Sequence, residues 1–214
     1  MRISTEVTTR ADVPDCLFAT DNAYGIPLLD RRYEGTHVDL PVMTWGATRR
    51  NQTMPGTYHF YTQDYRFEAL WSDPSPVINS RCVSVVEPNF TTSEQMPAAV
   101  AIYQTYRKRW LARLWQTFSI RTFVDLNVAP QWYDLNLAGV PRGWRAYMTR
   151  GYSERLDSLD HEYAQAIERA GTDDIVFAVY GGGKRVSFWC QERGLIHVQE
   201  TMDLAKDCVR KVEA

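Results

Sequence analysis

Short apolar runs of β-type residues alternate along this chain with stretches whose apolar residues recur at helical spacing. The runs cover 82–87, 121–125, 144–149, 175–180 and 195–200. Helical patterns cover 97–118 and 153–170. Parallel strands require crossover connections of this length, and helices usually supply them. The alternation therefore predicts an α/β protein with a mostly parallel sheet and crossover helices.

The number of strands does not choose between an open doubly wound sheet and an incomplete β/α barrel. Further short strands are expected at 58–61, 37–40 and 42–45. Both architectures place ligands beyond the carboxyl ends of their strands. Turn-forming residues dominate the first part of the chain, so we expect an irregular N-terminal arm over 1–55, packed on one α/β domain over 56–214.

Composition narrows the classes of function. Hydrophobic residues make up 44% of the chain and charged residues 23%, as in ordinary globular proteins. The net charge of −2 supplies no overall basic field for a nucleic-acid backbone. No apolar run reaches the roughly 18 residues of a membrane span, and the start resembles no signal peptide. We therefore expect a cytoplasmic protein that does not bind membranes, while the oligomeric state stays open.

The long helical pattern divides into an apolar and a basic face. Residues expected to point toward the core are Val100, Tyr103, Tyr106, Trp110, Leu114 and Phe118. The basic residues between them, Arg107, Lys108, Arg109 and Arg113, are expected on a solvated face, with phosphate contact as the alternative. The second helix should bury Leu156, Leu159, Tyr163 and Ile167.

Polar residues at or just past the strand ends are the first candidate site. They are Glu87, Asn89, Asp125, Asn127, Arg150 and Glu200. A parallel sheet would bring them to one edge, where carboxylates could bind Mg²⁺, or where Glu87 and Asp125 could act as acid and base. The alternative is that such carboxylates cap helices or pair with arginine.

A glycine-rich step is the second candidate. Gly181, Gly182, Gly183 and Lys184 follow an expected strand and precede a possible helix. Backbone N–H groups of such a loop can approach a phosphate, which the lysine would neutralise. The spacing matches neither a Walker nor a dinucleotide-binding motif, so a tight turn that needs only positive φ is the alternative.

Aromatic residues interleave with polar ones over 58–67, as in a base-stacking platform. Tyr61 and Arg66 are the candidate ligand contacts in this run. Alternating aromatics on a strand are also typical of a core face, and that alternative stays open.

Several motifs together resemble a known family. They are 56–71, Glu87-Pro88-Asn89-Phe90, Met96-Pro97, 106–110, Trp115-Gln116 and Gly139-Val140-Pro141. Their order over 29–183 is similar to that of the domain-of-unknown-function family numbered 4417, found in phages, plasmids and integrated elements. Family members often carry Ser-Pro-Asp-Phe in place of Glu87-Pro88-Asn89-Phe90, and Ser-Trp near Asp125. The family has no established activity, so the resemblance implies a mobile-element context and assigns no catalytic residue.

These observations lead to one main hypothesis and two alternatives. We expect a phosphate-bearing ligand, a nucleotide or a nucleic-acid strand, at the strand-end rim, with Mg²⁺ as a candidate cofactor. The first alternative is a hydrolase that uses Glu87 and Asp125. The second is a host-protein interaction module without catalysis.

Overall fold

The computed structural model describes residues 17–46 and 53–200. Its strands form one sheet in chain order, with every neighbouring pair parallel. They are β1 Val42–Thr44, β2 Thr57–His59, β3 Ser84–Val86, β4 Arg121–Asp125, β5 Ala146–Arg150, β6 Val176–Tyr180 and β7 Ile196–Val198. This arrangement confirms the α/β class and the parallel sheet.

The sheet curls into a nearly closed barrel. Strands β2 and β6 are four positions apart in the sheet, which would separate them by roughly 19 Å if it were flat. Instead the rings of His59 and Tyr180 lie 3.9 Å apart, and Thr44 Oγ1 lies 3.4 Å from the Tyr180 hydroxyl. The edge strands β1 and β7 do not pair, and a hollow lined by Val42 of β1 and Val198 of β7 separates them. The incomplete-barrel alternative is therefore the correct one.

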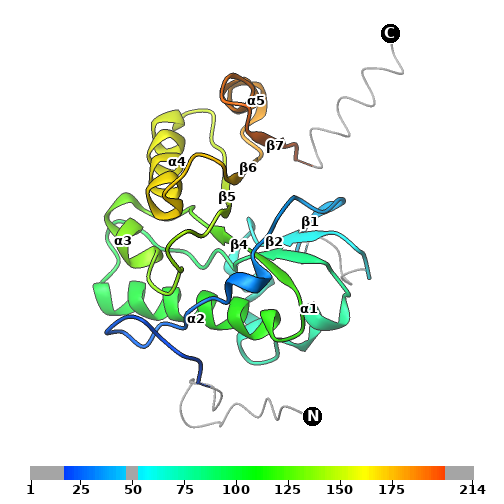
Figure 1. The fold of residues 1–214 in the computed structure, drawn as a ribbon, viewed down its shortest axis with the longest axis vertical. Coiled ribbons are helices and arrows are strands. Elements are labelled where there is room, and N and C mark those ends of the chain that lie inside the picture. The colour runs from blue at the N-terminus through cyan, green and yellow to red at the C-terminus, as the bar shows by residue number, and fades with distance from the viewer. Residues whose placement is uncertain (1–16, 47–52, 201–214) are drawn as a thin grey trace.

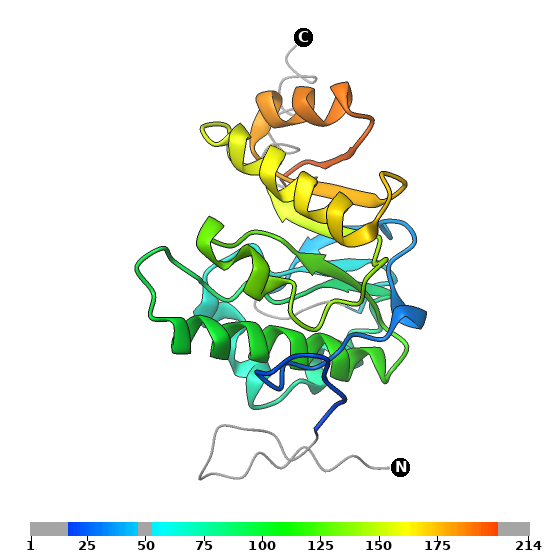
Figure 2. The same ribbon diagram turned by 60° about the vertical axis from the view of Figure 1, so that its left-hand side comes forward.

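Helices fill the crossovers after β2. The longest, α2 Ala98–Gln116, connects β3 to β4, while α4 Leu156–Ala170 and α5 Gly183–Glu192 follow β5 and β6. Figures 1 and 2 show α2 along one side of the strands and α4 and α5 toward the other end of the molecule. The short elements are α1 Ser75–Asn79, α3 Tyr133–Asn136, and the 3₁₀ turns η1 Arg31–Tyr33, η2 Asp64–Arg66, η3 Glu68–Trp71 and η4 Pro130–Trp132. No helix of the described residues is long and apolar enough to cross a membrane.

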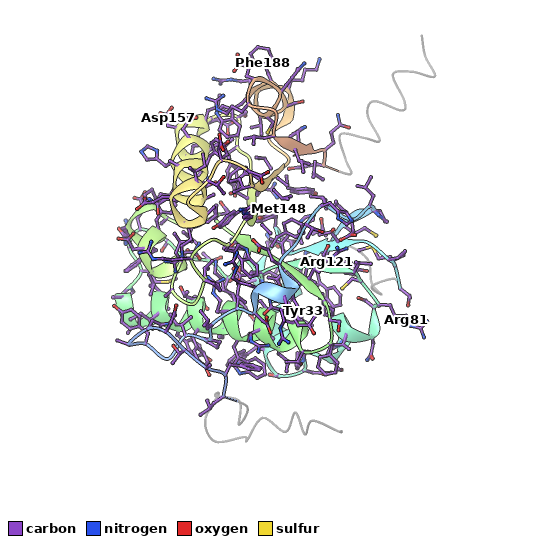
Figure 3. All side chains as sticks on the ribbon, viewed as in Figure 1. Tyr33, Arg81, Arg121, Met148, Asp157 and Phe188 are labelled. Atoms are coloured by element: carbon purple, nitrogen blue, oxygen red, sulfur yellow. The ribbon has the colours of Figure 1, made fainter. Side chains whose placement is uncertain are left out.

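The core has two parts. One is aromatic and lies between β2, β3 and α2, where the rings of Phe60 and Trp115 stack 5.7 Å apart. The other surrounds β5 and β6 and contains the fully buried Met148. Figure 3 shows Met148 at the centre of the molecule and Phe188, which is 61% exposed, at its periphery. Large aromatic side chains thus supply much of the buried area.

Three expectations about local structure are wrong. Residues 37–40 form no strand; Asp39 instead accepts hydrogen bonds from Ser84 and Arg121 at the starts of β3 and β4. Val100 and Tyr103 on α2, and Phe118 two residues beyond its end, are at least 36% exposed rather than buried.

The basic face of α2 is the larger error, because Lys108 is 2% exposed and Arg109 is 0% exposed. Both side chains turn toward the ends of the strands rather than toward solvent.

The predicted boundary between an arm and a domain stays a prediction. The described part of 1–55 contains η1 and β1, and β1 pairs with β2 as the edge strand of the sheet. Leu29 N–H donates to Gly139 O, and Asp30 N–H donates to Gln116 Oε1, so this region is hydrogen-bonded to the rest of the chain.

Candidate functional site

The strand-end residues lie at one edge of the barrel. Asp125 and Arg150 are the last residues of β4 and β5, and Glu87 directly follows β3. Gly182 and Glu200 lie two residues beyond the ends of β6 and β7. Because all the strands run parallel, these positions share the carboxyl-terminal rim, as the sequence predicted.

Glu87 is enclosed at this rim and paired with α2. The side chains of Glu87 and Arg109 are both 0% exposed, and the Arg109 guanidinium donates to Glu87 Oε1. Arg109 also donates to the carbonyl oxygens of Asn136 and Ala138. The pKa of Glu87 is raised above its usual value, because the effect of burial exceeds the opposing effect of Arg109 and Lys108. A buried carboxylate with this partner ties the helix to the rim.

Asp125 is paired in the same way. Lys108 Nζ lies 3.2 Å from Asp125 Oδ2, and Asn89 Nδ2 donates to that oxygen at 2.9 Å. Asn127 N–H donates to Oδ1, and Asn89 and Asn127 bond to each other. The Lys108 ammonium takes the position in which a cation would neutralise Asp125. Among the described residues, no group of three or more His, Cys, Asp or Glu side chains could hold a metal ion.

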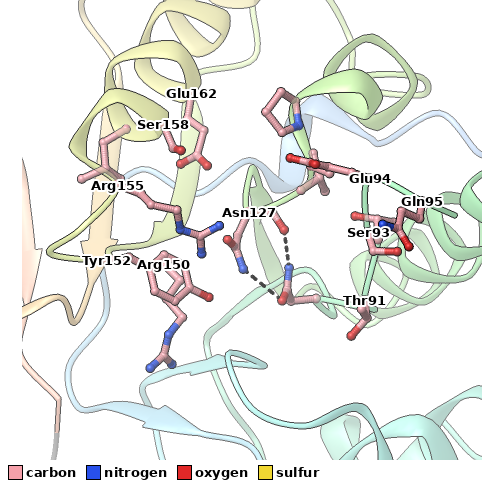
Figure 4. Close-up of a pocket in the computed structure, with 16 residues that line it drawn as sticks. Thr91, Ser93, Glu94, Gln95, Asn127, Arg150, Tyr152, Arg155, Ser158 and Glu162 are labelled. Carbon is pink, nitrogen blue, oxygen red and sulfur yellow. Dashed lines mark hydrogen bonds between the residues drawn. The ribbon is translucent and has the colours of Figure 1, made fainter.

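Above these pairs a polar cleft of about 530 Å³ opens between the β3–α2 and β4–α3 loops and the start of α4 (Figure 4). It is lined by Asn89, Thr91, Thr92, Ser93, Glu94, Gln95, Asn127, Val128, Ala129, Pro130, Arg150, Tyr152, Arg155, Ser158, Leu159 and Glu162. Glu87 and Asp125 are not among these lining residues. A second hollow, which includes Tyr61 and Tyr65, shares Asn89, Thr91, Arg150 and Tyr152 with the cleft.

Two arginines line the cleft, and they differ in their partners. Arg150 donates to Tyr61 O at 3.1 Å and to Glu200 Oε1 at 3.0 Å, so its charge is balanced. Arg155 is exposed, and its guanidinium lies 4.2 Å from the centre of the Tyr152 ring. It forms no ion pair with any described residue, and Figure 4 shows it pointing into the same space as Glu162 and Asn127. Arg155 is therefore the cation that the cleft leaves available.

Glu162 is a buried acid in the wall of the cleft, and sequence reasoning missed it. The Thr149 hydroxyl donates a hydrogen bond of 2.6 Å to Glu162 Oε2, and Glu162 is 4% exposed. Burial, with a smaller contribution from Asp125, raises the pKa of Glu162 to about 8. The carboxyl group therefore keeps its proton at neutral pH.

A signal for Glu162 was present in the sequence. Residues of α4 that are buried recur at three- and four-residue steps: Leu159, Glu162, Ala166 and Ala170. A carboxyl group at such a position in an apolar stripe indicates a buried acid.

Tyr61 and His59 lie below the cleft, inside the barrel. Burial raises the pKa of Tyr61 well above its usual value, and Asp125 and Glu162 add to the shift. Burial, with Arg150 nearby, lowers the pKa of His59 to about 3, so its imidazole is neutral. Its Nδ1 accepts from Tyr61 N–H at 3.2 Å, which leaves the proton on Nε2, where it faces Thr44 Oγ1. His59 is thus a buried hydrogen-bonding residue.

The glycine loop and Arg66 do not line the cleft. Gly181, Gly182 and Gly183 all have positive φ, between 66° and 78°. A Cβ on Gly182 would lie 2.4 Å from Val186 Cγ2, so the fold alone explains this glycine. Lys184 is exposed on the first turn of α5. Arg66 donates to Gly46 O at 2.9 Å and lines neither the cleft nor the neighbouring hollow.

Comparisons with known proteins place the chain in a phage context. A relative named "Gene 1 protein" from Mycobacterium phage D29 is 28% identical over 165 residues, which cover 74% of this chain and 58% of the relative. The "Gene 1 protein" of Mycobacterium phage L5 is 29% identical over 132 residues, or 59% of this chain and 56% of that protein. The chain thus matches little more than half the length of these relatives. No solved structure matches it. The model of the family described as Domain of unknown function (DUF4417) matches residues 18–177, and because this is most of the chain, the protein belongs to that family.

Proposed function

We propose that the rim cleft binds a phosphate-bearing ligand, either a nucleotide or a nucleic-acid strand. The observation that carries this proposal is Arg155, whose guanidinium lies in the cleft without an ion-pair partner among residues 17–46 and 53–200. A guanidinium binds phosphate through paired, charge-assisted hydrogen bonds. Arg150 also lines the cleft, but Glu200 already balances its charge.

The rest of the lining suits an oxygen-rich ligand. Hydroxyl and amide groups from Thr91, Ser93, Gln95 and Ser158 face the cleft. The Thr92 hydroxyl is buried and has no hydrogen-bond partner among the described residues. The volume of about 530 Å³ lies within the range of small-molecule sites, so one nucleotide, or one nucleotide of a strand, would fit.

The neighbouring hollow could extend this site. Tyr65 is 65% exposed there, and its ring is available to stack on a base. Tyr58, Phe60 and Phe67 are buried in the core, which leaves Tyr65 as the accessible aromatic ring of the 58–67 run. In this proposal Tyr61 supports the floor of the site through its carbonyl bond to Arg150.

The positions of the carboxyl groups change which residue could act as acid or base in the hydrolase alternative. Glu87 and Asp125 are enclosed and paired with cations, so neither is positioned to exchange protons with a ligand in the cleft. The protonated acid that does line the cleft is Glu162. An acid–base role in the cleft would therefore rest on Glu162, and the phosphate loop at Gly181, Gly182, Gly183 and Lys184 remains a separate proposal.

Binding titrations test the proposal. Adenosine monophosphate (AMP) and a single-stranded hexadeoxyadenylate would each be titrated into wild-type protein, Arg155→Gln and Arg145→Gln. Arg145 is an exposed arginine at the other end of β5, so its variant removes the same charge from the opposite edge of the sheet. We expect Arg155→Gln to weaken binding by about tenfold or more, since a charge-assisted hydrogen bond contributes about 1.5–3 kcal/mol. The Arg145→Gln protein should bind like wild type.

The two probes separate the two ligand classes. Binding of AMP alone would identify a nucleotide site, and binding of the hexamer alone would identify a strand site. Absence of binding by both probes, or equal affinities in Arg155→Gln and wild type, would contradict the proposal.

A further inference from the structure

We propose that Glu162 meets the ligand as a protonated carboxyl group, donating a hydrogen bond from Oε1 to a phosphate oxygen, so that ligand binding depends on a proton carried by the protein. This inference rests on the proposed function and adds a specific donor to it. It concerns binding and involves no covalent step.

The placement of the two carboxyl oxygens supports this role. Oε2 accepts the 2.6 Å hydrogen bond from Thr149 Oγ1, which fixes the side chain. Oε1 forms no hydrogen bond with a described residue, and it is not among the fully enclosed polar atoms without a partner. Glu162 lines the cleft, and Figure 4 shows its carboxyl group directed into it. The second oxygen is therefore free to meet a ligand.

The groups around Glu162 decide its charge. Asp125 at the end of β4 opposes ionisation of Glu162, and Arg155 favours it. Tyr61 and Tyr133 also face this carboxyl group, and the pKa of each tyrosine is raised, by burial first and by Glu162 in addition. Burial has the largest effect on Glu162 and raises its pKa to about 8, so the carboxyl group is mostly protonated at neutral pH.

A phosphate in the cleft would strengthen this preference. An ionised Glu162 would place a negative charge beside the negatively charged ligand, whereas the protonated form offers a donor. Binding should therefore be strongest when Glu162 is protonated and should weaken as pH rises through its pKa. Guanidinium groups do not lose their proton in proteins, so the effect belongs to the acid.

The role differs from a merely structural one. A glutamate that only anchors Thr149 would influence stability, but its ionisation would not make the affinity for the ligand depend on pH. Glutamine accepts the Thr149 bond through its carbonyl oxygen and presents an N–H₂ donor to the cleft, but it does not titrate. Glu162→Gln is therefore the variant that separates the two roles.

The test is the affinity for AMP and for hexadeoxyadenylate between pH 7.5 and pH 9.5, a range in which the phosphate charge of neither probe changes. If only the protonated form binds, wild-type affinity should fall by about 25-fold across this range, because a single group with a pKa of about 8 loses its proton there. Glu162→Gln should bind with an affinity that is constant within about twofold. Circular dichroism at each pH would confirm that both proteins are folded.

Two results would overturn the inference while leaving the proposed function standing. One is measurable wild-type binding that does not change with pH. The other is a fall in affinity of the same size in Glu162→Gln and in wild type. A wild-type protein that binds neither probe at any pH would remove the proposed function, and this inference with it.

Discussion

Lys108 Nζ lies 3.2 Å from Asp125 Oδ2, and both side chains are at most 3% exposed. This pair connects the middle of α2 to the last residue of β4. Arg109, the next residue, reaches Glu87 at the end of β3. Two successive basic residues of one helix thus pair with two carboxylates at the carboxyl ends of the neighbouring strands β3 and β4. The floor of the rim cleft is built on these pairs.

The first prediction concerns the buried pair. Lys108→Met should lower the free energy of unfolding by about 3–5 kcal/mol, because it leaves the Asp125 carboxylate buried without its cation. The double variant Lys108→Met/Asp125→Asn should lose much less than the sum of the two single variants. Urea denaturation of all four proteins measures the coupling. Additive losses would show that the two side chains do not interact.

The second prediction concerns the two sides of α2. Trp110 is 4% exposed in the aromatic part of the core, whereas Tyr103 on the same helix is 36% exposed. Trp110→Ala should cost about 3–5 kcal/mol of stability, as large-to-small core substitutions do. Tyr103→Ala should cost less than half as much. Equal decreases in the melting temperatures of the two variants would contradict the burial of Trp110 and the exposure of Tyr103.

The third prediction concerns why Gly182 is needed in the glycine loop: steric contact with a neighbouring side chain, or positive φ alone. Gly182 has a φ of 78° and a close neighbour in Val186, while Gly171 has a φ of 69° and nothing within 4 Å of its Cβ position. Gly182→Ala should therefore destabilise the protein by more than Gly171→Ala, which itself should cost about 1 kcal/mol. Thermal melts of the two variants make the comparison.

Lys184→Ala tests the same loop as a phosphate site. Lys184 is exposed, so the melting temperature of the variant should match that of wild type. Weaker AMP binding by Lys184→Ala would support a phosphate cradle in this loop. Unchanged affinity would restrict the glycines to their role in the turn.

The fourth prediction is the pH dependence of stability. The pKa of Glu162 is about 8 in the folded protein, above the value near 4.5 of an exposed glutamate. Between these values the folded state holds a proton on Glu162 that the unfolded state has released, so the contribution of Glu162 to stability is fully present below about pH 4.5 and is lost as pH rises toward 8. Each pH unit in this window removes about 1.4 kcal/mol.

Glu162→Gln removes that dependence and serves as the control. The difference in unfolding free energy between wild type and Glu162→Gln should change in favour of the variant between pH 6 and pH 9. Chemical denaturation at both pH values measures it. A constant difference would show that Glu162 ionises as easily in the folded protein as in the unfolded one.

The alternation of strands and helices could be predicted because short apolar runs mark the strands, and helical patterns over 97–118 and 153–170 mark the crossovers that contain α2 and α4. The rim position of Asp125 and Arg150 followed directly, since parallel strands end at one edge. The closure of the sheet did not follow, because it depends on contacts between distant strands, such as His59 with Tyr180. Strand patterns alone carry no information about such contacts.

The charged residues were harder to predict. Lys108 and Arg109 look solvent-exposed in sequence because charged side chains rarely lie in a core. Their burial depends on Asp125 and Glu87, which approach them only in the folded chain. Glu162 differs, because its place in the buried stripe of α4 could be read from the sequence, whereas its hydroxyl partner, Thr149, lies on another element. Charge pairs between elements are the part of this site that local patterns cannot supply.

The most direct test of the proposed site is a crystal structure of the protein grown with AMP and Mg²⁺. We expect the phosphate to lie in the rim cleft, with the Arg155 guanidinium and Glu162 Oε1 within hydrogen-bond distance of its oxygens. A nucleotide bound at the glycine loop of α5, or a rim cleft that stays empty at a saturating concentration of AMP, would contradict this expectation.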